Sequence, residues 1–272
     1  MTVGVASRVR FLAALALTAI ALAGCKTTSS TDTTGSISSG SRSEAEWRRD
    51  GEALGERFRA NPRDADNAVR YAQALRATGQ RAQAAAVLET AALHHPEDKV
   101  LLGAYGRALA DAGNFKQALD VLERAHSPDQ PDWRILSVQG AVMDQMGRHG
   151  EAQRYYASAL RIVPDEPSVL SNLGLSYALS KDLKRAEETL RRASATGSVD
   201  KRVRQNLALV VGLQGRFPEA ETIARADLPA AEASANVAYL RQLLAQKGNA
   251  NLKKTIRSRA VDGLEPVEET GS

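Results

Sequence analysis

Small side chains recur at a spacing of 34 residues through the middle of the chain. Two of these series run through Ala72, Gly106, Gly140, Gly174 and Ala208, and through Ala84, Ala118, Ala152, Ala186 and Ala220. A third series of alanines starts at Ala91, and a series of glycines starts at Gly79 and is interrupted at Lys181. Four parallel series at one spacing indicate internal repeats, because a general abundance of alanine would not keep them in step.

Large apolar residues fill the positions between the small ones at helical spacing. They are Leu75, Leu109, Met143, Tyr177 and Val211 in the first half of each unit, and Leu88, Leu122, Tyr156 and Leu190 in the second half. Glycine or alanine at the series positions lets two helix axes approach to about 8–10 Å. The glycines at the Gly79 register end the first helix at low cost. Each unit is therefore predicted to be a pair of helices.

A 34-residue unit of two helices identifies tetratricopeptide repeats. We place five of them at 65–98, 99–132, 133–166, 167–200 and 201–234, with an irregular second helix near 225–229 in the last. An open stack must cover its two ends. We therefore predict capping helices over 43–60 and 235–244. The predicted fold class is an all-α tetratricopeptide-repeat solenoid, with the repeat domain spanning 43–247.

The amino-terminal 24 residues have the pattern of a secretory signal peptide. Two arginines precede an uncharged apolar run over 11–24, which as a helix spans only about 21 Å and is too short for a bilayer core of about 30 Å. The run ends in Leu22, Ala23, Gly24 and Cys25, which resembles the bacterial lipobox. The resemblance implies that Cys25 carries a diacylglycerol unit and that cleavage follows Gly24. Two or three acyl chains hold a protein stably on a membrane.

The segments that flank the repeats are predicted to be flexible. Residues 25–42 are rich in Ser and Thr and form a linker after the acylated cysteine, and residues 248–272 form a mobile charged tail that changes from basic to acidic. Residue 26 is Lys, whereas Asp at this place retains lipoproteins in the inner membrane of enteric bacteria. We therefore expect the protein at the periplasmic face of the outer membrane.

Composition and motifs give little sign of catalysis. The single cysteine excludes an intramolecular disulfide framework and a cysteine zinc cluster. The net charge of +4 in 272 residues does not indicate nucleic-acid binding. The chain lacks a glycine-rich phosphate loop, a His-Glu-x-x-His motif and a Gly-x-Ser-x-Gly motif. We predict a protein that is not an enzyme, with no cofactor, no metal site and no small-molecule substrate.

The first helix of each repeat is expected to line an inner groove that binds protein partners. The groove candidates by register are Arg76, Arg107, Arg134, Asp144, Asn172, Arg202, Gln205 and Asn206. Asn172 and Asn206 share one register, and their amides could bond either the backbone of an extended peptide or the end of a neighbouring helix. For the charged candidates the alternative is an ordinary solvated face.

Several segments go beyond the general repeat pattern. They are LGAYGRALADAG at 102–113, PDWR at 131–134, QGAVMDQMGR at 139–148, RQNLALVVGLQGR at 204–216, ARADLP at 224–229 and NVAYL at 236–240. Over 43–245 the chain resembles the TadD lipoproteins of the Flp/Tad (tight adherence) pilus system. The resemblance implies a pilotin-like helper of the outer-membrane secretin, with the secretin or other Tad components as partners. A lipoprotein adaptor of another envelope machine, such as a type IV pilus, an outer-membrane protein insertion complex or a cell-wall enzyme complex, stays open.

Overall fold

The computed structural model describes residues 42–195 and 201–245. The signal peptide with Leu22, Ala23 and Gly24, the acylation site Cys25, nearly all of the linker and the tail over 248–272 lie outside the described residues. Within them the chain forms helices and no strand, apart from an isolated bridge between Ser127 and Gln130. The helices are α1 (Glu44–Ala60), α2 (Ala65–Ala77), α3 (Arg81–Ala92), α4 (Lys99–Asp111), α5 (Phe115–Arg124), α6 (Trp133–Gln145), α7 (His149–Ile162), α8 (Pro167–Leu179), α9 (Leu183–Ser194), α10 (Lys201–Leu213), α11 (Phe217–Ala224) and α12 (Ala230–Ala245).

Most of the first helices of the pairs, and α1, begin where an acidic or hydroxyl side chain caps them. Ser43 starts α1 with a capping box, in which its hydroxyl accepts from the backbone N–H of Glu46 and the Glu46 carboxylate accepts from that of Ser43. The N-caps of α2, α4, α6 and α8 are all acidic and recur every 34 residues, at Asp64, Asp98, Asp132 and Glu166. Each accepts a bond from an otherwise unpaired N–H of the first turn, which stabilises a helix by about 1 kcal/mol.

The turn inside each repeat requires a left-handed backbone. The turn glycines have φ between 78° and 85°, as the glycine series predicts, and Lys181 adopts the same conformation with φ of 69°. A residue with a Cβ pays about 1–2 kcal/mol there. Repeat four therefore keeps the geometry of the other turns at a cost in stability.

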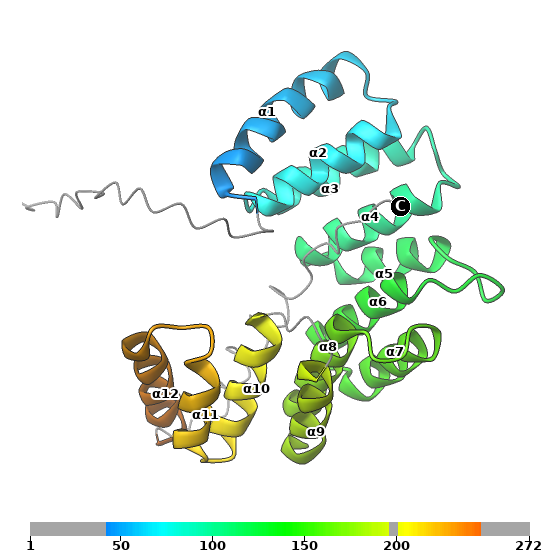
Figure 1. Cartoon of the computed structure of the whole chain (residues 1–272). Helices are drawn as coiled ribbons and strands as arrows, with labels where there is room; N and C mark the ends of the chain where they lie inside the picture. The colour runs from blue at the N-terminus through cyan, green and yellow to red at the C-terminus, as the bar shows by residue number, and fades with distance from the viewer. Residues whose placement is uncertain (1–41, 196–200, 246–272) are drawn as a thin grey trace, which may run out of the picture. The chain divides into compact units, whose positions relative to one another are not determined.

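Five helix pairs follow one another along the stack (Figure 1). They are α2 with α3, α4 with α5, α6 with α7, α8 with α9, and α10 with α11, and each second helix also packs on the first helix of the next pair. The extra helix α1 packs on α2, and α12 packs on α10 and α11. The predicted all-α repeat fold is confirmed, and α11 ends at Ala224, just before the segment 225–229 that was expected to be irregular.

The first helices of successive pairs also contact one another, from α2 to α4 and onward to α10. Their side of the stack is therefore the closely spaced inner side, which we call the A-helix face. None of the described helices has both the length and the apolar character needed to cross a lipid bilayer.

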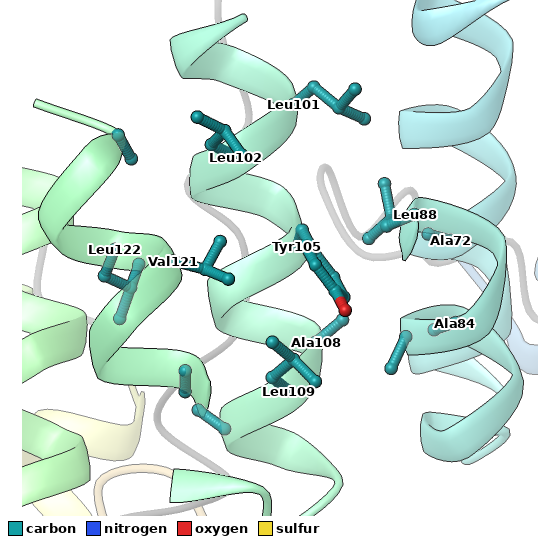
Figure 2. Close-up of a cluster of buried hydrophobic side chains, with 14 of the residues drawn as sticks. Ala72, Ala84, Leu88, Leu101, Leu102, Tyr105, Ala108, Leu109, Val121 and Leu122 are labelled. Atoms are coloured by element: carbon teal, nitrogen blue, oxygen red, sulfur yellow. The ribbon is translucent and has the colours of Figure 1, made fainter. Parts of the chain in front are cut away.

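The core depends on the small residues. The alanines of the Ala84 series, including Ala152, have no solvent exposure. A Cβ on Gly106 would lie 2.5 Å from Cγ of Leu122, and one on Gly140 would lie 2.7 Å from the ring of Tyr156. Figure 2 shows the layer between the first two repeats, where Tyr105 of α4 points towards α3. Large side chains of one helix therefore occupy the space that the glycine of its partner leaves free.

Candidate protein-binding face

The amino-terminal part of the A-helix face carries a cluster of charges. Arg76 of α2 donates to a carboxylate oxygen of Asp111 on α4 across 2.5 Å, and their side chains are only 13% and 8% exposed. Half-buried Arg107 lies beside this pair. Burial and then the charge of Arg76 lower the pKa of Arg107 to about 10, against the opposing effect of Asp111. Arg107 is still protonated at neutral pH, and a further carboxylate would relieve the repulsion between the arginines.

The central part of the face carries a serine–asparagine ladder, which consists of Ser137, Asn172, Ser171 and Asn206. Nδ2 of Asn172 donates to Oγ of Ser137 across 3.4 Å, and Nδ2 of Asn206 donates to Oγ of Ser171 across 3.0 Å. These bonds connect α6 to α8 and α8 to α10. Both asparagines are 8% exposed, and no further hydrogen bond of their Oδ1 atoms is found within the described residues.

The ladder shows which protein groups the amides of Asn172 and Asn206 bond. Each asparagine bonds a side chain of the preceding first helix, and not the end of a neighbouring helix. The remaining acceptor on Oδ1 keeps the capacity to accept from a peptide N–H.

The prediction that Asp144 lies open on the groove is wrong. Its side chain is buried, and the residue is 2% exposed. It accepts hydrogen bonds from Tyr156 (3.1 Å) and Ser176 (2.8 Å) and pairs with Nδ1 of His149 (2.8 Å). Burial raises the pKa of this carboxyl group, and the bonds from His149 and Ser176 offset part of the rise. Asp144 therefore joins α6, α7 and α8 internally and is not available to a partner.

The other candidates lie on first helices in more open positions. Arg134 is exposed near the start of α6, with its guanidinium 4.7 Å from the centre of the Trp133 ring. Arg202 is exposed near the start of α10, and Gln205 is half-buried one turn later. The structure thus brings Arg76, Arg107 and Arg134 near one another, whereas Arg202 and Gln205 belong to the last repeat.

Sequence reasoning missed several buried polar residues, among them Gln139 of α6, Asn67 of α2 and Ser176 of α8. The place of Gln139 holds Tyr71, Tyr105, Leu173 and Leu207 in the other repeats. A polar residue in an otherwise apolar series was the signal that could have found Gln139.

Comparisons with known proteins identify the family to which the chain belongs. A tetratricopeptide-repeat family model matches residues 75–141 and 145–210, and a second model with the same description matches 202–226. Together the matches cover more than half of the chain. The chain belongs to the tetratricopeptide-repeat family. Proteins of this family bind other proteins through their repeats, and this tetratricopeptide-repeat protein is an interaction scaffold.

Solved structures share the tetratricopeptide-repeat fold at low sequence identity. PilW, described as a widely conserved type IV pilus biogenesis factor, matches with a TM-score of 0.61 at 16% identity, over 71% of this chain and 91% of PilW. The Cut9–Hcn1 hetero-tetramer of APC/C matches with 0.60 at 15% identity, over 81% of this chain and 43% of the matched chain. At these identities the likeness shows the fold alone. A comparison with curated proteins gave no significant match.

Proposed function

We propose that the protein is a lipid-anchored scaffold that holds segments of envelope proteins on its A-helix face and assists assembly of the Flp/Tad pilus secretin. The role is one of binding and not of catalysis. It rests on the resemblance of the repeat segments to TadD lipoproteins, with Cys25 as the lipid attachment site. PilW, which shares the fold, is described as a type IV pilus biogenesis factor.

The serine–asparagine ladder is the observation that carries the binding role. Neighbouring helices are about 8–10 Å apart, and an extended peptide rises about 3.3 Å per residue. A peptide that crosses the A-helix face therefore meets the next rung after about three residues. Each rung offers Oδ1 of Asn172 or Asn206 to a backbone N–H, and the arginine cluster at the other end of the face favours an acidic residue.

Site-specific photocrosslinking in intact cells tests the proposed partner. A photoreactive phenylalanine at Arg134 or Arg202, both exposed on first helices, should capture the secretin or another Tad component. The matched control is Arg154, on the second helix α7 with a side chain 74% exposed, which should capture neither. Capture of a type IV pilus, outer-membrane insertion or cell-wall enzyme component instead would contradict the Tad assignment.

The membrane anchor has its own test. Cys25→Ser removes the thiol that acylation requires, so the variant should remain an uncleaved precursor, take up no labelled fatty acid and reduce the number of surface pili. The matched control is Thr27→Ser, which changes a residue beyond the cleavage site and should be processed and acylated as the wild type is. Normal fractionation of Cys25→Ser with outer membranes would refute the anchor.

A further inference from the structure

The arginine cluster of the A-helix face, formed by Arg76, Arg107 and Arg134, has more positive than negative charge. Asp111 pairs with Arg76, and Asp132 accepts a hydrogen bond from the backbone N–H of Arg134 at the start of α6. Burial and the charges of Arg76 and Arg134 lower the pKa of Arg107, whereas the two aspartates raise it. Within the described residues the main charges at this place are thus three arginines and two aspartates. The cluster can accept a further carboxylate.

The sequence that follows α12 separates its charges into two blocks. Residues 246–259 contain five lysines and arginines and no acidic residue. Residues 260–272, which we call the acidic block, contain four acidic residues and no lysine or arginine. Blocks of like charge are often interaction segments. The charge of the acidic block is therefore complementary to that of the arginine cluster.

The acidic block is close enough along the chain to reach the cluster. Helix α12 ends at Ala245, and Glu265 follows 20 residues later. A fully extended chain of 20 residues spans up to about 66 Å, and a random coil of that length spans about 22–27 Å on average. Contacts lead from α12 to α10, α8, α6 and α4. At about 8–10 Å for each of these four steps, the cluster lies about 32–40 Å from α12.

We propose that the acidic block binds to the arginine cluster of the same chain and competes with protein partners for the A-helix face. Its carboxylates pair with Arg107 and Arg134. Because block and cluster belong to one chain, the block is present at an effective concentration on the order of millimolar. A second copy offers the same block only at the bulk concentration of the protein. The inference rests on the proposed binding role of the A-helix face, and it adds that a partner must displace the block.

A peptide with the sequence AVDGLEPVEETGS, which is that of the acidic block, serves as the probe. Fluorescence anisotropy of the labelled peptide measures its affinity for the full chain, purified in a non-ionic detergent. An amide variant of the full chain carries Asp262→Asn, Glu265→Gln, Glu268→Gln and Glu269→Gln. It should bind the probe about 10-fold more tightly than the wild type, because its own block no longer competes. Equal affinities would show that the block does not occupy the cluster and would overturn the proposal.

Substitutions of arginines in the amide variant locate the site of binding. Arg107→Gln removes a half-buried charge and should weaken the probe by about 10-fold, and Arg134→Gln removes an exposed one and should weaken it by about 5-fold. The matched control is Arg154→Gln on α7, whose side chain is 74% exposed, and it should leave the affinity unchanged. Urea denaturation verifies that each variant is folded. An equal loss in Arg154→Gln would indicate general attraction of charges and would contradict a site at the cluster.

Sedimentation velocity separates binding within one chain from binding between copies. The wild type and the amide variant should have the same oligomeric state at every protein concentration. Association of the wild type that the amide variant lacks would assign the acidic block to a second copy, and the proposal would be wrong. These measurements use no pilus component. The photocrosslinking at Arg134 and Arg202 therefore tests the proposed function independently of them.

Discussion

Repeats two and three have the same backbone plan but different interiors. In repeat two the first helix buries Tyr105 and Ala110, and the tyrosine hydroxyl is paired with Gln117. At the same two places repeat three buries Gln139 and Asp144. Both repeats form an antiparallel helix pair with a glycine turn, so these polar residues do not alter the local fold.

The two buried polar residues of repeat three differ in whether their oxygen atoms have hydrogen-bond partners. Asp144 has partners on two other helices, and its hydrogen bond from Ser176 connects repeats three and four. The Oε1 atom of Gln139 has no hydrogen-bond partner among the described residues, and its burial costs stability. A buried polar group that has hydrogen-bond partners supports the packing around it, whereas a buried polar group that lacks them lowers stability.

The largest loss of stability is expected from removing the hydrogen-bonded carboxyl group of Asp144. Asp144→Ala leaves the hydroxyls of Tyr156 and Ser176 buried without their acceptor, so the free energy of unfolding should fall by about 3 kcal/mol. Urea denaturation measures this loss. Asp144→Asn keeps one acceptor oxygen and should lose less. A loss below 1 kcal/mol for the alanine variant would remove the distinction between the two repeats, since about 1–3 kcal/mol is expected for one unsatisfied group.

The next largest difference in stability between repeats two and three is expected from replacing the glycines that lie opposite large side chains. In Gly140→Ala the new methyl group meets the ring of Tyr156, which is held by its bond to Asp144, and about 2–3 kcal/mol of stability should be lost. In Gly106→Ala it meets the aliphatic side chain of Leu122, which no hydrogen bond holds in place, and the loss should be smaller, about 1 kcal/mol. Thermal and urea denaturation of both variants check the order, and equal losses would show that Tyr156 is not held rigidly.

Substitutions in the turns should change stability by less, and the change should be the same in repeats two and three. Gly113→Lys and Gly147→Lys each place a side chain at a positive φ and should each cost about 1 kcal/mol. The reverse change, Lys181→Gly in repeat four, should stabilise the protein by about the same amount. Calorimetry of the three variants tests this. Neutral behaviour of Lys181→Gly would mean that the lysine side chain makes a compensating contact.

The last difference is one in pH dependence between the buried carboxylate of Asp144 and the half-buried carboxylate of Glu187. Burial raises the pKa of Asp144 above its ordinary value of 3.8, so the associated stability is present below that value and is lost as the pH rises through the raised pKa. Burial alone would raise the pKa of Glu187 also, but bonds from Arg216, Gln214 and Arg191 outweigh it and lower this pKa to about 2. Its contribution is present above 4.5 and is lost as the pH falls towards 2.

Urea denaturation between pH 3 and about 7 compares these two groups. Relative to the wild type, Asp144→Asn should gain stability as the pH rises, and Glu187→Gln should gain stability as the pH falls. Parallel changes in the two variants would contradict the opposite shifts of pKa.

Much of the fold was predictable because its determinants are local and periodic. The small residues at Gly106 and Ala118 recur at a fixed spacing, and the turn glycines mark where each first helix ends. The terminal helices followed from the need to cover an open stack. Helix α1 lies where it was expected, whereas α12 begins at Ala230 and not at the predicted residue 235. The acidic N-caps at Asp98 and Asp132 recur at the same spacing, and they could have been used to predict where the first helices begin.

The candidate site was predictable only as a set of first-helix positions. The hydrogen bond between Asn206 and Ser171 joins residues 35 apart, and the one between Asp144 and Ser176 joins residues 32 apart. Whether such residues face each other depends on the rotation of one helix against the next, and local sequence does not specify that rotation. For this reason Asp144 looked like an open groove residue.

By itself, the amino-acid sequence determined the repeat length, the helix pairs and their turns, because each depends on side-chain size and backbone preference within one 34-residue unit. Only the tertiary structure decided that the carboxylate of Asp144 has internal partners, that Oε1 of Gln139 has none within residues 42–195 and 201–245, and that Gln139 lines a pocket. Those outcomes depend on how tightly successive repeats pack, which is set by contacts between residues that are distant along the chain.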